Sequence, residues 1–180
     1  MQNMINDAMI VSGVSEYGII PADFAFVRDR SHMVIYEAEL NEDVLAQLIR
    51  FSEDWTAENS CYGYRPNDRS DIEGNRIFLA EEGGAAAGYL FGKVLKSEQM
   101  RSVMPEGTPY FEVEELYVVP DKRSCGIGGE LFRYAEDAVK AEAEYMVLST
   151  ATKNWKAVFN FYLDELDMEF WSARLFKKIR

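Results

Sequence analysis

A loop with three closely spaced glycines, set between a strand-like run and a helix-like run, constrains the fold of this chain more than any other feature. Residues 110–119 are rich in β-branched and aromatic side chains, and Pro120 follows them. Beyond the glycines at 126, 128 and 129, apolar residues recur at helical spacing over 128–143. Such a loop aims backbone N–H groups and a helix N-terminus at one point, where no Cβ obstructs an anion. The pattern predicts a phosphate-binding strand–loop–helix unit, with a tight turn that binds no ligand as the alternative.

Two common phosphate-binding motifs do not fit this loop. In the dinucleotide-binding pattern Gly-x-Gly-x-x-Gly, the third glycine would fall at Leu131. A Walker A loop would end in Gly-Lys-Ser/Thr, which this loop does not. The spacing Arg123-x-x-Gly126-x-Gly128 therefore belongs to another kind of nucleotide-binding loop or to none.

The remaining periodicities predict one α/β domain over residues 33–180. Gly83-Gly84 separates two strand-like runs, as in a tight hairpin, and Asn41 can cap a helix after the first strand. We expect a mixed, mainly antiparallel central sheet flanked by helices on both faces. Residues 1–32 are expected to form an N-terminal extension, to which the sequence assigns no role. The expected strands are 33–38, 76–82, 85–96, 110–119, 145–150 and 168–176, and the expected helices are 41–51, 128–143 and 155–166, with a long connection over 56–75.

Charge and cysteine content exclude several classes of protein. The net charge of -12 opposes binding to nucleic acid, and no basic stripe suits an anionic membrane. Cys61 and Cys125 lie far apart without a histidine cluster, so neither a disulfide framework nor a metal site is expected. Without a recognisable signal peptide or membrane span, the expected location is the cytoplasm. Acid is concentrated in residues 1–75, which could attract a cation or simply keep the protein soluble.

The glycine loop and the strand before it resemble those of the GCN5-related N-acetyltransferase (GNAT) superfamily. Arg123-x-x-Gly126-x-Gly128 matches that family's arginine/glutamine-x-x-glycine-x-glycine/alanine signature, and residues 115–120 resemble its fourth strand. The order of elements is similar over residues 33–176. The resemblance implies the acyl-CoA N-acyltransferase fold, acetyl-CoA as acyl donor, and a pantetheine arm inserted between splayed fourth and fifth strands. The cofactor-binding residues that it implies are Leu116, Tyr117, Val118, Arg123, Ser124, Cys125, Gly126, Ile127, Gly128, Gly129 and Asn154.

Acidic residues in the fourth strand are candidate general bases. The resemblance implies direct attack of the acceptor amine on the acetyl carbonyl, so the protein supplies orientation and proton transfer. Glu112, four residues before Leu116, resembles the base of several relatives, and Glu114 is the next candidate. On a regular strand these two face one side of the sheet and Glu115 faces the other. An exposed acidic face without a catalytic role is the alternative.

Tyr162 is the candidate proton donor to the departing thiolate of coenzyme A. Relatives place a tyrosine with this role after the fifth strand, in the pattern Asn-x-x-Ala-x-x-x-Tyr. Counted from Asn154 and Ala157, the tyrosine position falls at Phe161, one residue early. Either the helix contains an extra residue, as in a π-bulge, or one match is fortuitous. Tyr162 could equally belong to an ordinary apolar helix face.

The predicted function is transfer of the acetyl group from acetyl-CoA to a primary amine of a small cationic acceptor. Trp55, Tyr62 and Tyr64 could turn their rings toward such a cation. An acyl-CoA-binding regulatory or sensor module without turnover would share the loop motif, and a plain α/β interaction domain would share only the fold. The sequence identifies neither the acceptor nor the oligomeric state, so a homodimer is left open.

Overall fold

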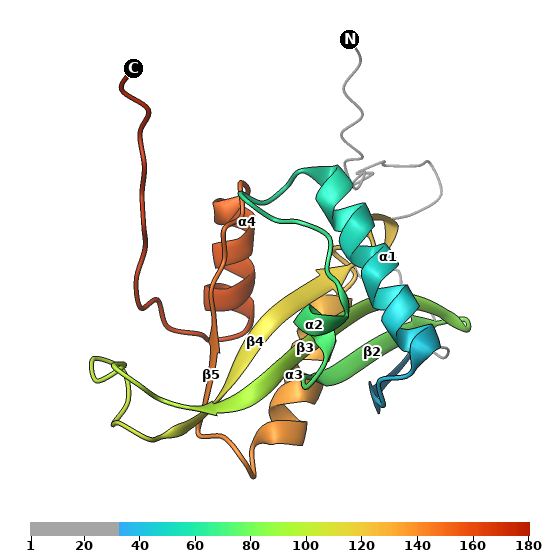
Figure 1. Cartoon of the computed structure of the whole chain (residues 1–180), viewed down its shortest axis with the longest axis horizontal. Coiled ribbons are helices and arrows are strands. Elements are labelled where there is room, and N and C mark those ends of the chain that lie inside the picture. The colour runs from blue at the N-terminus through green and yellow to red at the C-terminus, as the bar shows by residue number, and fades with distance from the viewer. Residues whose placement is uncertain (1–32) are drawn as a thin grey trace, which may run out of the picture. The chain divides into compact units, whose positions relative to one another are not determined.

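The computed structural model of the protein describes residues 33–180 (Figure 1). The expected N-terminal extension over residues 1–32 lies outside the described residues, so that assignment stays a prediction. Within residues 33–180, no helix is both long enough and apolar enough to cross a membrane.

One sheet of five strands contains, in spatial order, β1 (Met33–Ala38), β2 (Arg76–Glu82), β3 (Ala85–Lys96), β4 (Pro109–Val118) and β5 (Tyr145–Leu148). Neighbouring strands from β1 to β4 are antiparallel, and β5 runs parallel to β4. The connection between β2 and β3 is the predicted hairpin, in which Gly83 and Gly84 have φ angles of 63° and 80°. Residues with a Cβ rarely adopt two such angles in succession. The predicted mixed, mainly antiparallel sheet is confirmed.

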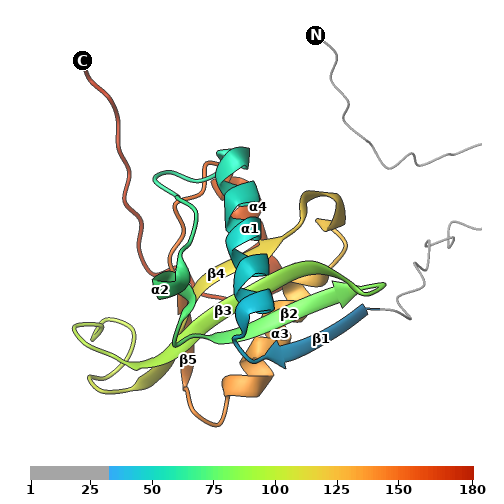
Figure 2. The ribbon, with the colours of Figure 1, turned by 45° about the vertical axis from the view of Figure 1, so that its right-hand side comes forward.

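The helices are α1 (Glu42–Glu58), α2 (Arg69–Ile72), α3 (Ile127–Val139) and α4 (Trp155–Phe159), which a π-helical turn at Asn160–Glu165 extends. Asn41 caps α1 as predicted, because its Oδ1 accepts hydrogen bonds from the backbone N–H groups of Asp43 and Val44 at 3.0 and 2.9 Å. α1 covers one face of the sheet and α3 covers the other (Figures 1 and 2).

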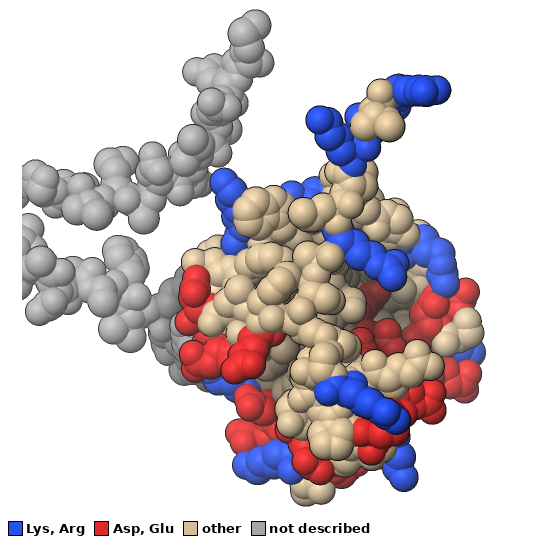
Figure 3. All heavy atoms as spheres, turned by 90° about the vertical axis from the view of Figure 1, so that its left-hand side faces the viewer, with Lys and Arg blue, Asp and Glu red and all other residues tan. Residues whose placement is uncertain are grey.

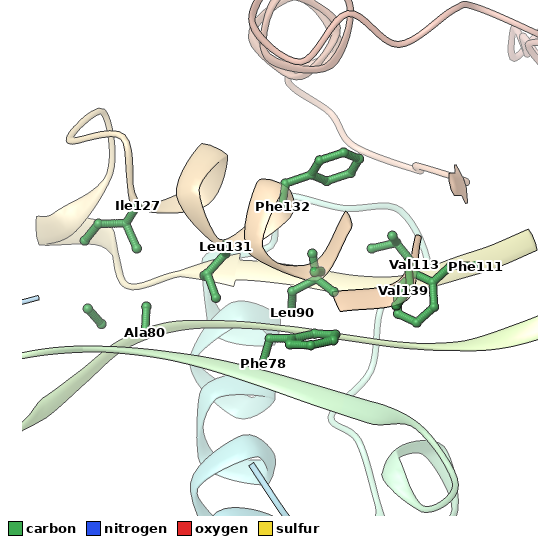
Figure 4. Close-up of a cluster of buried hydrophobic side chains, with 11 residues drawn as sticks. Phe78, Ala80, Leu90, Phe111, Val113, Ile127, Leu131, Phe132 and Val139 are labelled. Atoms are coloured by element: carbon green, nitrogen blue, oxygen red, sulfur yellow. The ribbon is translucent and has the colours of Figure 1, made fainter. Parts of the chain in front are cut away.

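Each face of the sheet has its own apolar core. On the α3 side, Phe78 and Phe111 of the sheet pack against Leu131 of the helix, and all three are fully buried (Figure 4). On the α1 side, Leu48 of the helix packs over Tyr89 of β3. Burial of one such side chain contributes roughly 1.5–3 kcal/mol. The two cores therefore fix both helices against β4, the strand on which the predicted site lies.

Residues 168–176 do not form the predicted sixth strand, so β5 is an edge of the described sheet. A run rich in apolar and aromatic residues becomes a strand only where a neighbouring backbone supplies hydrogen bonds. Side-chain contacts hold this segment instead. Trp171 Nε1 donates to Ser102 Oγ at 3.0 Å, and the Phe176 ring meets the Tyr62 ring edge-on at 5.3 Å.

Candidate functional site

β4 and β5 separate partway along the sheet. Residues 110–113 of β4 pair with Tyr145–Leu148, whereas the rest of β4 pairs only with β3 among the described residues. The two strands diverge visibly beyond this point (Figure 1). One edge of the β4 backbone therefore has no strand beside it, and its hydrogen-bonding groups face an opening. The splayed strands that the resemblance implies are present, and Leu116, Tyr117 and Val118 lie along the opening.

The glycine loop turns through two left-handed residues before α3 begins. Ser124 has a φ angle of 58° and Gly126 one of 84°, and Gly126 is the N-cap residue of α3. The N–H groups of the first helical residues, Ile127, Gly128 and Gly129, have no acceptor within the helix. Together with the positive end of the helix dipole, they form the kind of site that binds pyrophosphate.

The Arg123 side chain connects this loop to α1. Its Nη1 and Nη2 donate to the two carboxylate oxygens of Glu58 at 2.8 and 2.7 Å, and its Nε donates to the Val118 carbonyl at 2.8 Å. The guanidinium also lies 5.3 Å from the centre of the Tyr117 ring, whose pKa burial and the Glu58 charge raise to about 12. Because Arg123 is engaged in this way, the anion-binding capacity of the loop resides in its backbone.

The helix after β5 contains the extra residue that the register mismatch suggested. α4 begins after Asn154, its exposed N-cap residue, and passes into the π-helical turn at Asn160–Glu165. Tyr162 lies inside this wider turn, in which each hydrogen-bonded ring takes in one more residue than in an α-helix. The π-bulge explanation therefore fits the spacing between Asn154 and Tyr162, and a fortuitous match is not needed.

Tyr162 packs beside α3 through its aromatic ring. Its ring lies 6.2 Å from that of Phe132 and 4.9 Å from that of Phe161. Burial raises the pKa of Tyr162 to about 12, so the phenol is protonated at neutral pH. No hydrogen bond joins the hydroxyl to any residue in 33–180. Tyr162 therefore packs on an apolar helix face, as one interpretation of the sequence expects, and also has a hydroxyl that could donate a proton, as the other interpretation requires.

A β-bulge in β4 changes the direction in which its acidic residues point. The pairing with β3 shifts between Phe91 and Gly92, and Glu114 is the residue without a cross-strand partner. One extra residue inverts the facing of every side chain after it. Glu115 therefore faces the same side of the sheet as Glu112 and Glu114, and the prediction that it faces the opposite side is wrong.

A pocket of about 250 Å³ lies where β4 and β5 separate, on the α1 side of the sheet. Its walls come from the end of α1, the loop after it, the bulge of β4 and the chain after β5. Glu114 borders the pocket and Glu112 does not. Figure 3 shows acidic side chains inside a hollow on this side of the molecule. The lining residues are Trp55, Cys61, Tyr62, Gly63, Tyr64, Glu114, Glu115, Ser149, Thr150 and Ala151.

The three acidic residues of β4 have different electrostatic surroundings. Glu114 forms an ion pair with Lys93 at 2.9 Å. Burial, and next the charge of Glu114, raise the pKa of the half-buried Glu112, while Lys93 opposes the shift. Burial also raises the pKa of Glu115. No group of three or more His, Cys, Asp or Glu residues within 33–180 is arranged to hold a metal ion.

The chain after β5 completes the pocket, which sequence analysis did not foresee. The Tyr62 N–H donates to the Ala151 carbonyl at 2.9 Å, and the Lys153 N–H donates to the Ser60 carbonyl at 2.8 Å. These bonds join the loop after α1 to a segment about ninety residues later in the chain. No local pattern signals such a contact, because it depends on how β5 is placed beside β4.

Comparison of the sequence with protein-family profiles identifies the family of this chain. Residues 42–164 match the profile of the Acetyltransferase (GNAT) family, and the chain belongs to this family. No curated protein sequence matches the chain significantly. The resemblance inferred from the glycine loop is thereby confirmed.

Solved structures share the fold at low sequence identity. An aminoglycoside acetyltransferase from an uncultured soil metagenomic sample, in complex with trehalose, is 15% identical, with a TM-score of 0.60 over 83% of this chain and 98% of its own. A transcriptional regulator from Bacillus halodurans C-125 is 19% identical, with a TM-score of 0.60 over 82% and 100%. The aminoglycoside N-acetyltransferase AAC(6')-Iy, in complex with the bisubstrate analogue CoA-S-monomethyl-acetylneamine, is 17% identical, with a TM-score of 0.59 over 83% and 99%. These likenesses confirm the predicted acyl-CoA N-acyltransferase fold.

Proposed function

We propose that the protein transfers the acetyl group of acetyl-CoA to a primary amine of a small cationic acceptor by direct attack. The observation that supports this most is that β4 joins the two halves of the site. Its end leads into the glycine loop at residues 123–129, and its bulge at Glu114 borders the pocket. From Glu114 to Val118 a strand spans roughly 13 Å. An extended arm held by the loop could therefore reach the pocket along β4.

The residues of the opening suit acetyl-CoA as the donor. The N–H groups at the start of α3 can bind its pyrophosphate. The open edge of β4 at Leu116, Tyr117 and Val118, where the Val118 carbonyl already accepts from Arg123, can pair with the amides of its pantetheine arm. When bound there, acetyl-CoA supplies a thioester carbonyl to the pocket. The complex of AAC(6')-Iy with coenzyme A supports this assignment by analogy of fold.

The proposed reaction requires that the acceptor amine lose one proton and that the coenzyme A thiolate gain one. The amine nitrogen bonds to the acetyl carbon, and the carbon–sulfur bond of the thioester breaks. Glu114 directly, or Glu112 through water, accepts the proton that the amine loses, and the Tyr162 hydroxyl donates one to the departing thiolate. No protein nucleophile takes part. Burial raises the pKa of the Cys61 thiol in the pocket, which keeps it protonated and unreactive.

The pocket favours an acceptor with positive charge. Two carboxylates, Glu114 and Glu115, and the rings of Trp55 and Tyr64 border it, and both kinds of group attract ammonium ions. Among the described residues, β4 supplies the acidic side chains of the pocket, whereas residues 33–75 supply the aromatic rings. The soil metagenomic acetyltransferase has also been solved with the aminoglycoside sisomicin, which supports a search among polycationic amines.

A turnover screen tests this proposal. Release of free coenzyme A from acetyl-CoA would be followed with a panel of aminoglycosides, polyamines, amino acids and peptide N-termini. We expect amine-dependent release that is strongest for cationic small molecules. If the protein binds acetyl-CoA tightly but no amine causes release of coenzyme A, a regulatory or sensor module would be favoured instead. If the protein does not bind coenzyme A at all, a plain α/β interaction domain would be favoured.

We expect Glu112→Gln to lower kcat/KM about tenfold at neutral pH. Glu112 does not border the pocket, so it accepts the proton through water, and its removal costs less than the roughly 100-fold usual for direct transfer. Since burial and Glu114 raise the pKa of Glu112, wild-type activity should decline with falling pH already above the range of an ordinary glutamate. The pH–rate profile measures both effects, because the variant should lose this acidic limb.

Glu98→Gln is the matched control, since it removes the same charge from an exposed position. It should keep the wild-type profile. If Glu112→Gln and Glu114→Gln both keep near-full activity and an unchanged acidic limb, solvent takes the amine proton and neither residue is a base.

A further inference from the structure

Glu115 is a partly buried carboxylate that accepts hydrogen bonds from neutral groups and has no ion-pair partner within residues 33–180. Its Oε2 accepts a hydrogen bond from the Tyr89 hydroxyl at 2.6 Å and another from Asn67 Nδ2 at 2.9 Å. No lysine or arginine in residues 33–180 forms an ion pair with it, whereas its neighbour Glu114 is paired with Lys93. The charge of Asp71, which is negative, also acts to raise its pKa. Among the described residues, Glu115 is therefore the acidic residue of the pocket whose charge no cation compensates.

A charge in such surroundings is costly unless a counter-ion arrives. Removing a carboxylate from water disfavours its charged form, so the group either binds a proton or faces a cation. Both hydrogen bonds reach Oε2, and the Tyr64 hydroxyl adds a weaker contact that also lowers the pKa of the carboxyl, so Oε1 can still accept from another donor. Tyr89 and Asn67 also fix the orientation of the carboxylate, so a ligand need not order it. The side chain is arranged for a ligand that donates a hydrogen bond.

Tyr64 borders the same pocket as Glu115. Its hydroxyl oxygen is buried and makes no hydrogen bond of good geometry within residues 33–180, although it lies close enough to Glu115 and Tyr89 to affect the pKa values of both. Buried hydroxyls without a partner are uncommon and often mark a binding site. The Tyr64 ring lies 4.5 Å from the ring of Trp55, which adds an aromatic surface suited to a cation. Tyr62 is less available, because Lys153 Nζ already lies 5.3 Å from its ring centre.

We propose that Glu115 and Tyr64 bind a second ammonium group of the acceptor, one that does not react. The acceptor is then a diamine or longer polyamine, in which one amine receives the acetyl group near Glu114 and the other donates hydrogen bonds to Glu115 Oε1 and the Tyr64 oxygen. Trp55 covers the same ammonium group. This inference rests on the proposed acetyl transfer, and it assigns Glu115 to substrate selection rather than to proton transfer.

Two amines of equal length test the second binding site. Cadaverine and n-pentylamine share the reacting amine and the carbon chain, but only cadaverine has a second ammonium group. We expect the wild-type protein to prefer cadaverine by about tenfold or more in kcat/KM, as one charge-assisted hydrogen bond allows. Glu115→Gln keeps an oxygen for Tyr89 and Asn67, and it should abolish the preference, because kcat/KM falls far more for cadaverine than for n-pentylamine. Glu73→Gln, exposed and outside the pocket, should keep the preference.

A second variant protects the test against misfolding of Glu115→Gln. Tyr64→Phe keeps the ring and removes only the hydroxyl, and we expect it to reduce the cadaverine preference about threefold. Equal loss of activity toward both amines in the Glu115 variant would mean a structural role and overturn the proposal. An unchanged preference for cadaverine in folded Glu115→Gln would also overturn the proposal. If Glu115→Gln does not fold, an unchanged preference in Tyr64→Phe would overturn it instead.

Titration calorimetry separates this inference from the proposed function. Cadaverine is titrated without acetyl-CoA into the wild-type protein, Glu115→Gln and Tyr64→Phe. If the wild type acetylates no amine, the proposed function fails, yet cadaverine binding that is lost in Glu115→Gln would still support the site. The proposed second ammonium site would be overturned if the wild type does not bind cadaverine, or if the wild type and both variants bind it equally strongly. Either result would count even if acetyl transfer to other amines is observed.

Discussion

Gly128→Val is expected to weaken the binding of coenzyme A at least about 100-fold, which corresponds to roughly 2.7 kcal/mol. A Cβ at position 128 would lie 3.3 Å from Phe161 Cζ and 3.7 Å from Val118 Cγ2. The two further methyl groups of valine must therefore displace Phe161 or enter the space over the first turn of α3. Either change moves or covers the N–H groups that would bind the pyrophosphate. Titration calorimetry with coenzyme A measures the loss.

Ala141→Val is the matched control for this substitution. It adds the same methyl groups at an exposed position beyond the C-terminal end of α3, so its affinity should equal that of the wild type. If folded Gly128→Val, checked by circular dichroism, binds coenzyme A as tightly as the wild type, the glycine loop is not the pyrophosphate site.

Tyr162→Phe is expected to lower kcat about 100-fold with no change in the affinity for coenzyme A. The substitution keeps the ring that packs against Phe132 and Phe161, and it removes only a hydroxyl that has no partner within the described residues. Because burial raises the pKa of this phenol to about 12, the group is a proton donor throughout the neutral range. Steady-state kinetics and a coenzyme A titration together separate turnover from binding.

Tyr134→Phe removes a hydroxyl from the partly exposed side of α3 and should leave both quantities unchanged. A Tyr162→Phe protein with wild-type kcat would assign Tyr162 to packing alone. A fall in coenzyme A affinity equal to the fall in kcat would likewise contradict the role of proton donor, since it would reflect damage to the binding site.

Features with a local cause could be predicted from the sequence. The hairpin at Gly83-Gly84 and the cap at Asn41 depend on backbone angles and hydrogen bonds within a few residues, and both occur where expected. The glycine loop likewise leads from β4 into α3 as the spacing indicated. Even the π-helical turn was detectable, because the count from Asn154 to Tyr162 is one residue too long for the family pattern.

Features that depend on distant segments could not be predicted in this way. The bulge at Glu114 follows from the pairing with β3, and without it Glu115 would face the opposite side of the sheet. The hydrogen bond from Asn67 to Glu115 joins a loop to a strand 48 residues away. Residues 168–176 have the composition of a strand, but no neighbouring backbone pairs with them among the described residues. Each of these outcomes is decided by tertiary contacts that override local preference.

Transfer of an isotopically labelled acetyl group tests the central claim most directly. The protein is mixed with acetyl-CoA labelled in the acetyl group and with the best amine from the turnover screen, and products are followed by mass spectrometry over a single turnover. Direct attack predicts that the label appears on the amine in step with free coenzyme A, while the protein mass stays unchanged. Label on the protein before it reaches the amine, or labelled acetyl-CoA that is not consumed while amine is present, would contradict the proposed function.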